Sequence, residues 1–326
     1  MYCNTSCTVA KIERKTVCRR SDAEKYMRRC LELAKKGQAS VAPNPMVGAV
    51  IVHKGKIVGE GYHRKWGEAH AEVHAIRAVK KEELLKDSTL YVNLEPCSHQ
   101  GKTPPCVDLI IEKQIPRVVV GQIDPFHSVA GKGLERLKNA GIEVETGILQ
   151  EACEQLNRRF LTFVEKKRPY ILLKWAQSAD GYLDKMREPG DGQEPVRFSD
   201  DFTRMLVHKM RAEASAITVG ARTEALDKPL LNVRYWSGNN PVRIPADSRK
   251  TLPSLLHDLH AQGIQSLMVE GGAKLLQSYI DENLWDEARI EISVRELREG
   301  LKAPVFSGTL VSVQKCKKSS ILLYKH

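Results

Sequence analysis

The chain has 326 residues, 42% hydrophobic and 28% charged, a composition that excludes a largely disordered protein and a length that allows two domains. No apolar run reaches the roughly 18–20 residues of a membrane span and residues 1–15 lack the apolar block of a secretory signal, so we expect a cytoplasmic location. The formal charge of +11 favours an anionic substrate, a phosphorylated cofactor or nucleic acid, although surplus Lys and Arg also keeps proteins soluble.

The first 165 residues predict alternating strands and helices. The capping-box pattern from Ser21 to Glu24 precedes apolar residues at helical spacing that continue to Gly37, so we expect the folded domain to begin near residue 20. The further expected elements are a hairpin over 46–59, helices over 70–80, 105–111, 134–139 and 150–164, and strands over 91–94, 117–121 and 142–145. This β-β-α-β-α-β order implies a sheet covered by helices.

A second strand-first unit follows the basic residues 166–168. Pro169 disfavours helix at the residue before it, which makes this segment the best boundary. The expected elements beyond it are strands over 170–173, 216–220 and 267–270, and helices over 201–213 and 252–261, with a polar stretch over 232–250. The predicted organisation is an extension, a first domain, a linker and a second domain over residues 1–19, 20–165, 166–169 and 170–326.

Four residues of the first domain form a candidate zinc site. His70 and Glu72 stand at an expected helix start, and Cys97 and Cys106 follow the next strand. A catalytic zinc has three protein ligands and leaves one position for water, which one His and two Cys would satisfy. A carboxylate that is not a ligand can carry a proton from that water to a departing amine, so we predict Glu72 as the catalytic residue.

A structural zinc site is the alternative interpretation of these residues. Such a site would normally have four protein ligands, and only His74 and His99 could supply the fourth. The remaining six cysteines have no comparable neighbours, and we interpret them as ordinary thiols; they are Cys3, Cys7, Cys18, Cys30, Cys153 and Cys316.

The His-Ala-Glu and Pro-Cys-x8-Cys elements resemble the cytidine-deaminase superfamily. Within it, PCSHQGKTPPC over 96–106 is similar to the deaminase half of bifunctional riboflavin-biosynthesis deaminase–reductases, whereas many other deaminases have two residues between the cysteines. PNPMVG over 43–48, GYHRKWGEAHAE over 61–72 and VAGKG over 129–133 also match. The resemblance implies a cytidine-deaminase-like three-layer α/β domain, bound Zn²⁺ and a diaminopyrimidinone ribosylamino 5′-phosphate as substrate.

The same resemblance implies a deaminase substrate pocket lined by Asn44, His63, His99 and Lys102. The amide of Asn44 can recognise the edge of a ring, and Lys102 can meet a phosphate as a point charge. The ordinary alternatives are an asparagine that serves a turn and a lysine that is merely solvated.

The second half is similar to the reductase domain of the same family, a dihydrofolate-reductase-like α/β fold that uses NADPH to reduce the ribosyl group to a ribityl chain. The match rests on KWAQSADG over 174–181, on residues 223–234 and on VEGG over 269–272, where glycines before a helix suit a phosphate. The implied substrate-binding residues are Arg211, Leu231, Arg234 and Glu270. The implied cofactor-binding residues are Ala176, Thr223, Asp227 and Gly272.

The second half departs from the family pattern at two places. Lys228 stands where the family has an acidic residue or asparagine before proline, and residues 244–252 replace a much longer segment that supplies a strand and a helix. We therefore expect a shortened reductase-like domain, in which lost elements would uncover apolar surface and remove part of the NADPH pocket unless the core has repacked.

The leading hypothesis is thus a bifunctional enzyme acting on a small phosphorylated pyrimidine, expected to be a homo-oligomer, dimer or tetramer, without a nucleic-acid partner. One alternative is a tRNA or nucleoside deaminase, which the positive charge and the shared zinc chemistry favour. The other is a non-catalytic zinc-containing RNA-binding protein, against which the retained Glu72 argues.

Overall fold

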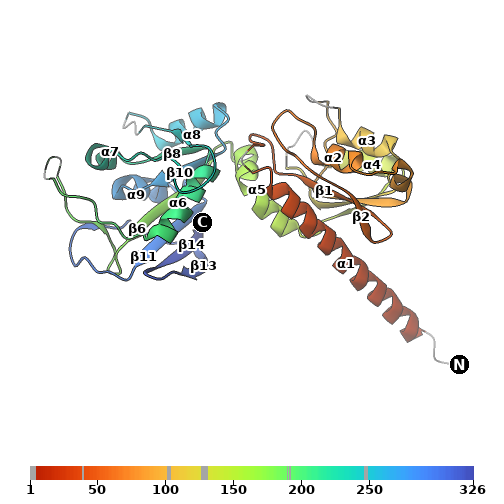
Figure 1. Ribbon diagram of the computed structural model, residues 1–326, viewed down its shortest axis with the longest axis horizontal. Helices are drawn as coiled ribbons and strands as arrows, with labels where there is room; N and C mark the ends of the chain where they lie inside the picture. The colour runs from red at the N-terminus through yellow and green to blue at the C-terminus, as the bar shows by residue number, and fades with distance from the viewer. Residues whose placement is uncertain are drawn as a thin grey trace. The chain divides into compact units, whose positions relative to one another are not determined.

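The computed structural model describes residues 5–38, 40–100, 104–125, 131–188, 190, 192–245 and 249–326, with side chains from residue 20 onward. The chain divides into two compact units, Met1–Glu165 and Lys166–His326 (Figure 1). Within the described part of the chain, none of the helices has the length and apolar character to cross a membrane.

The first unit is built on a five-stranded sheet with the order β2-β1-β3-β4-β5. β1 pairs antiparallel with β2 and β3, and β3, β4 and β5 run parallel. The strands are β1 (Gly48–His53), β2 (Lys56–Tyr62), β3 (Ser88–Leu94), β4 (Arg117–Gln122) and β5 (Glu143–Thr146). The other elements are α1 (Thr5–Lys35), α2 (Ala71–Arg77), the 3-10 helix η1 (Glu82–Asp87), α3 (Cys106–Glu112), α4 (Lys132–Asn139) and α5 (Gln150–Glu165).

Alternating residues of the strands send apolar side chains to both faces of this sheet. On β1, Ala49 and Ile51 join a core with α2, α3 and α4, whereas Val50 and Val52 join a core with α1 and α5. Figure 1 shows these two layers of helices with the sheet between them. The expected three-layer deaminase-like fold and its β-β-α-β-α-β order are confirmed.

The expected start of the first helix is wrong. α1 begins at Thr5, so Ser21 lies inside the helix and does not cap it. The physical reason is that residues 5–20 contain no Gly or Pro and several good helix formers, so nothing in the chain stops the helix upstream of the capping-box pattern. Cys30 of α1 and Cys153 of α5 are buried in the core that these helices share with the sheet.

The second unit has a seven-stranded sheet with the order β13-β14-β11-β6-β10-β8-β9. β11, β6, β10, β8 and β9 run parallel, and β14 and β13 are added antiparallel at one edge. The strands of this sheet are β6 (Tyr170–Gln177), β8 (Ala216–Thr218), β9 (Val242–Arg243), β10 (Ser266–Glu270), β11 (Glu287–Ser293), β13 (Thr309–Lys315) and β14 (Ser319–Lys325). A separate two-stranded sheet pairs β7 (Tyr182–Asp184) with β12 (Leu301–Lys302). The helices are α6 (Asp201–Glu213), α7 (Ala221–Asp227), α8 (Leu252–Ala261) and α9 (Ala273–Asp281).

Helices cover both faces of this sheet as well. Side chains of α8 and α9 pack with one face, and Val207 and Met210 of α6 pack with the other. Among the described residues between α7 and α8, the two-residue strand β9 lies at the edge of the sheet, where Val242 is 53% exposed. The sheet thus ends at β9, with some exposed apolar surface at that edge.

Candidate metal centre and reductase cavity

The candidate zinc ligands come from three chain segments that the fold brings to one place. His70 is the residue before α2, and Ala71 and Glu72 form the first turn of that helix. Cys97 follows the end of β3, and Cys106 is the first residue of α3. Two helix starts and one strand end thus meet at the same edge of the sheet.

The three ligand atoms have the spacing of a metal site. Nδ1 of His70 lies 3.4 Å from Sγ of Cys97 and 3.4 Å from Sγ of Cys106, and all three atoms lie within 4.8 Å of one another. In a tetrahedral site with Zn–N of about 2.0 Å and Zn–S of about 2.3 Å, nitrogen and sulfur stand about 3.5 Å apart. The residues therefore fit a zinc ion.

The protonation states of the two thiols and the imidazole depend on one another. Hydrogen bonds from the Cys106 side chain and from His70 lower the pKa of Cys97 to about 4. The neighbouring Cys97 thiolate in turn raises the pKa of His70 to about 9 and keeps Cys106 protonated by raising its pKa. A cation that binds here would replace these protons, as expected for a site that holds a divalent metal.

Glu72 is buried beside these ligands, with 3% of its surface exposed. Its Oε2 atom has no hydrogen-bond partner among the residues that the structure describes. Burial raises the pKa of Glu72, and the nearby Cys97 raises it further, while His70 opposes the change. A buried carboxylate with one partner-free oxygen is suited to take up and release a proton.

Two of the predicted pocket residues are held together next to the ligands. Nδ2 of Asn44 lies 3.1 Å from Nε2 of His63, whose Nδ1 lies 3.2 Å from the carbonyl oxygen of Ala69. His63 is 2% exposed, burial lowers its pKa, and its ring packs edge-on against His70 at 5.3 Å. A neutral His63 therefore donates to Ala69 and accepts from Asn44. His99 is exposed, and Lys102 lies outside the described residues.

Two asparagines that sequence reasoning missed hold the loop that carries Asn44. Oδ1 of Asn93 accepts from the backbone N–H of Gly48 at 2.7 Å, and the side chain of Asn157 bonds both the N–H and the carbonyl of Met46. Asn93 is fully buried in β3 and Asn157 is 1% exposed in α5. A polar residue inside an apolar strand was the available signal for Asn93.

In the second unit, the predicted substrate residues lie around α6. The Arg211 guanidinium donates two hydrogen bonds of 2.7 Å to the Glu270 carboxylate and a third, of 3.1 Å, to the carbonyl oxygen of Asn232. The backbone N–H of Arg234 donates to Nδ1 of His208, and the Arg234 side chain is exposed. Leu231 is buried with a φ of 52°.

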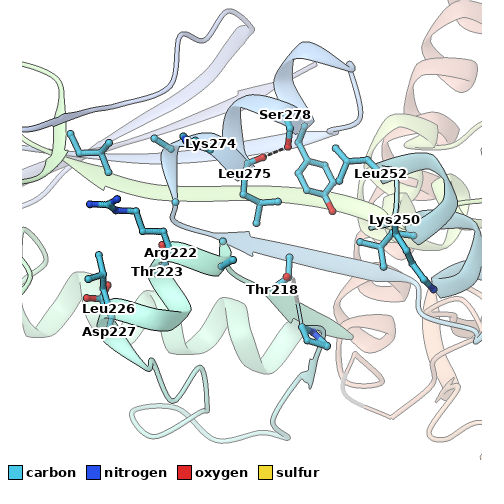
Figure 2. A pocket seen from close by; sticks show the side chains of 18 of the residues that line it. Thr218, Arg222, Thr223, Leu226, Asp227, Lys250, Leu252, Lys274, Leu275 and Ser278 are labelled. Carbon is cyan, nitrogen blue, oxygen red and sulfur yellow. Dashed lines mark hydrogen bonds between the residues drawn. The ribbon is translucent and has the colours of Figure 1, made fainter. Parts of the chain in front are cut away.

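A cavity of about 770 Å³ opens between α7, α8 and α9 of the second unit (Figure 2). Thr223, Asp227 and Gly272 line it, whereas Ala176 on β6 is not among its lining residues. Gly272 has a φ of 81°, and a Cβ there would lie 3.1 Å from Oγ1 of Thr223. The glycine therefore leaves room for another molecule to approach the backbone at the start of α9.

Comparison with known proteins gives matches for both units. The model of the cytidine and deoxycytidylate deaminase zinc-binding region matches residues 20–122, and the RibD C-terminal domain matches residues 169–319. The riboflavin biosynthesis protein RibD of Aquifex aeolicus is 39% identical over 85% of this chain and 88% of that protein. The chain belongs to the RibD family.

Other relatives and solved structures agree. RibD of Escherichia coli is 46% identical over 69% of this chain and 63% of its own length, and the match to RibD of Actinobacillus pleuropneumoniae spans 59% of that protein. The diaminohydroxyphosphoribosylaminopyrimidine deaminase/5-amino-6-(5-phosphoribosylamino)uracil reductase of Thermotoga maritima is 35% identical, with a TM-score of 0.84 over 94% of this chain and 99% of that one. The structure of Acinetobacter baumannii RibD is 31% identical to this chain, with a TM-score of 0.83. The expectation of a deaminase half and a reductase half is confirmed.

Lys228, one of the two expected departures from the family pattern, has an unusual backbone conformation. This residue ends α7 with a φ of 39° and a ψ of 53°, the left-handed conformation. Asn and Asp tolerate that conformation better than other residues with a side chain. Beside it, Asp227 accepts a 2.7 Å hydrogen bond from Arg187, a residue that sequence reasoning missed.

Proposed function

We propose that this chain is a bifunctional enzyme of riboflavin biosynthesis. The first unit would hydrolyse an amino group from 2,5-diamino-6-ribosylamino-4(3H)-pyrimidinone 5′-phosphate, and the second would reduce the ribosyl group to a ribityl chain with NADPH. Membership of the RibD family supports both steps. The observation that carries the deaminase step is the 3.4 Å approach of His70 Nδ1 to both thiol sulfurs beside the buried Glu72.

In the deaminase step, His70, Cys97 and Cys106 would hold the zinc ion. A zinc ion bound by three protein ligands acidifies water and acts as a Lewis acid. Glu72 takes a proton from the water that adds to the ring carbon and passes it to the departing amine, so that ammonia leaves and a ring carbonyl forms. Its partner-free oxygen and its raised pKa suit both halves of that transfer.

Asn44 would orient the ring over Glu72. His63 occupies one N–H of the Asn44 amide, so the other N–H and the carbonyl oxygen stay available for a pyrimidine edge. By the family resemblance, His99 and Lys102 would complete the pocket, since a lysine can meet a phosphate as a point charge. Substrates with a different ring edge would leave Asn44 unpaired, which gives the site its selectivity.

In the reductase step, Thr223, Asp227 and Gly272 would bind the cofactor in the cavity, and Ala176 would meet it from the end of β6. The cationic lining residues Arg222 and Lys274, labelled in Figure 2, favour a phosphorylated dinucleotide, a class that includes NADPH. Arg211 and Arg234 would bind the substrate phosphate, and Leu231 and Glu270 would complete that site. Bound NADPH would supply the hydride for C1′ of the ribosyl group, where the bond to the ring oxygen breaks and that oxygen takes up a proton, which gives the ribityl chain.

The two steps can be tested separately in one coupled assay. The zinc-loaded chain is given the diaminopyrimidine phosphate and NADPH, and ammonia release and NADPH oxidation are followed independently. We expect both signals, with NADPH oxidation dependent on prior ammonia release. Ammonia without NADPH oxidation would refute the reductase assignment, and neither signal in a zinc-containing protein would refute the deaminase assignment.

The two alternative functions have less support than this one. A tRNA or nucleoside deaminase and a non-catalytic RNA-binding protein both leave the second unit unexplained, because residues 169–319 match the RibD C-terminal domain. Nucleic-acid binding would be detected as salt-sensitive RNA affinity. The cytoplasmic location remains a prediction.

We also propose that the chain forms homo-oligomers, as a dimer or a tetramer. In support, β13 is an edge strand whose seven residues are all exposed, including Leu310, Val311 and Val313 at 49%, 47% and 50%. Exposed apolar edge strands favour pairing with another chain. Light scattering on the purified chain would report a multiple of the 36.6 kDa chain mass, and a monomer would contradict the proposal.

A further inference from the structure

The connection between the two candidate zinc thiols is long, and the structure shows what anchors it. Eight residues separate Cys97 from Cys106, so the short chain that fixes both sulfurs in a Cys-x-x-Cys site is absent here. Direct contacts between the two ends are a 3.3 Å bond from the Cys106 N–H to Sγ of Cys97 and one of 3.2 Å from the N–H of Val107 to the carbonyl of Cys97. Two side chains anchor the connection further through contacts with α4 or from it.

The first anchor is Glu95, two residues before Cys97. Its side chain is 4% exposed, and its backbone N–H donates to the carbonyl oxygen of Gln122 at 2.9 Å. Its carboxylate accepts four backbone N–H groups at 3.2, 3.0, 3.0 and 3.4 Å, those of Asp124, Gly131, Gly133 and Leu134. Both the main chain and the side chain of this residue are therefore fixed.

Three of these donors belong to the N-terminal turn of α4. The residue that precedes the helix is Gly131, which has no side chain to cap it, so the Glu95 carboxylate takes that role from a distant loop. The positive end of the helix dipole favours the buried negative charge. A Cβ on Gly133 would lie 2.4 Å from the carbonyl oxygen of Pro96, so only glycine lets α4 approach the Cys97 loop this closely.

The second anchor is Arg136, in the next part of the same helix. Its Nη1 donates to the carbonyl oxygen of Ser98 at 2.9 Å, and its Nη2 forms an ion pair with Asp108. Ser98 directly follows Cys97, and Asp108 lies two residues after Cys106. One guanidinium on α4 thus joins the two segments that carry the sulfurs.

We propose that Glu95 and Arg136 are positioning residues that hold the Cys97 and Cys106 thiolates at zinc-binding distance. This inference rests on the ligand set proposed above. The two side chains act through the backbone of residues 95–98 and through α3, and neither is itself a ligand. Contacts of this kind commonly change metal affinity by about 10–100-fold.

The test is the zinc dissociation constant of the full chain, measured by competition with a chromophoric chelator. Glu95→Gln puts an amide NH₂ group among N–H donors, and we expect zinc binding about 10–100-fold weaker. Arg136→Gln removes the link from Ser98 to Asp108, and we expect about tenfold weaker binding. The d–d absorption of the Co²⁺-loaded variants should change as well, because the sulfurs are repositioned.

Arg117→Gln is the matched control, because Arg117 makes ion pairs with Glu143 and Glu145 in the same unit, away from the thiols. Cys97→Ser tests the ligand set itself: if it binds zinc like the unaltered chain, the ligand set is wrong. If Cys97→Ser loses zinc while both Glu95→Gln and Arg136→Gln bind it normally, the positioning role is refuted and the ligand set stands. Should Glu95→Gln not fold, the half-exposed Arg136 decides the question alone.

Discussion

His63 and Asn44 form a side-chain pair with 3.1 Å between Nε2 and Nδ2, directly beside the His70 ring. His63 fixes the amide of Asn44 because its other ring nitrogen is held by the carbonyl of Ala69. We expect His63→Ala to lower kcat/KM for ammonia release by about 10–100-fold, since the amide then loses its orientation. Zinc content, measured in the same samples, should not change.

His257→Ala is the control for this variant, because His257 is an exposed histidine of α8 in the other unit. Unchanged ammonia release by His63→Ala would show that Asn44 needs no support from His63.

The arrangement of the zinc residues was predictable because each signal is local in the sequence. His70 and Glu72 are two residues apart at a helix start, and the cysteines follow a strand that its apolar residues predict. The start of α1 was not predictable, because a capping pattern has no effect inside a helix that continues past it. The roles of Glu95 and Arg136 were equally hidden, because their partners, most of them backbone groups, lie 28–39 residues away.

In the second unit, sequence reasoning found the cavity residues Thr223, Asp227 and Gly272 by family resemblance and missed Arg187. Arg187 pairs with Asp227 across 40 residues and with Asp184, contacts that arise only from tertiary packing. The effect of the shortened segment could not be predicted from the sequence either. It depends on whether the sheet can end in a two-residue strand at its edge.

Gly272→Ala should weaken cofactor binding. The substitution places a side chain at a φ of 81° and within 3.1 Å of Thr223 Oγ1. We expect KM for NADPH to rise about tenfold, which corresponds to about 1.4 kcal/mol of strain and lost contact. Ammonia release, which belongs to the first unit, should stay unchanged.

Gly263→Ala is the control for the backbone strain of this variant, because Gly263 has a φ of 77° and nothing lies within 4 Å of the added Cβ. It should lower stability slightly and leave KM for NADPH unaltered. Equal KM values for the two alanine variants would contradict the role of Gly272 in the cavity.

Lys228→Asn should stabilise the second unit. The left-handed backbone at Lys228 suits asparagine better than lysine, so we expect a gain of about 0.5–1 kcal/mol in the free energy of unfolding. Urea unfolding followed by tryptophan fluorescence measures this unit, in which Trp175 and Trp285 are buried. A loss of stability would mean that the lysine side chain itself contributes a contact at this turn.

The Arg211–Glu270 pair predicts how acid affects the second unit. Burial alone would raise the pKa of Glu270, but Arg211 and Lys174 outweigh it, and the pKa lies below its ordinary value. A depressed pKa in the folded state stabilises the fold above the unfolded pKa of about 4.3, and this stabilisation disappears as pH falls through the folded value. Melting temperatures should therefore fall steeply below about pH 4.

Glu270→Gln should melt at a lower temperature than the unaltered chain at pH 7 and should show a shallower fall in acid. Parallel melting curves for both proteins across this pH range would exclude a stabilising role for the pair.

The most direct measurement on the deaminase site combines zinc content with ammonia release in Glu72→Gln. The amide keeps the size of the side chain but cannot carry a proton, so zinc should remain bound while ammonia release falls on the order of 10³-fold. Normal ammonia release by the zinc-loaded variant would contradict the assignment of Glu72 as the proton carrier.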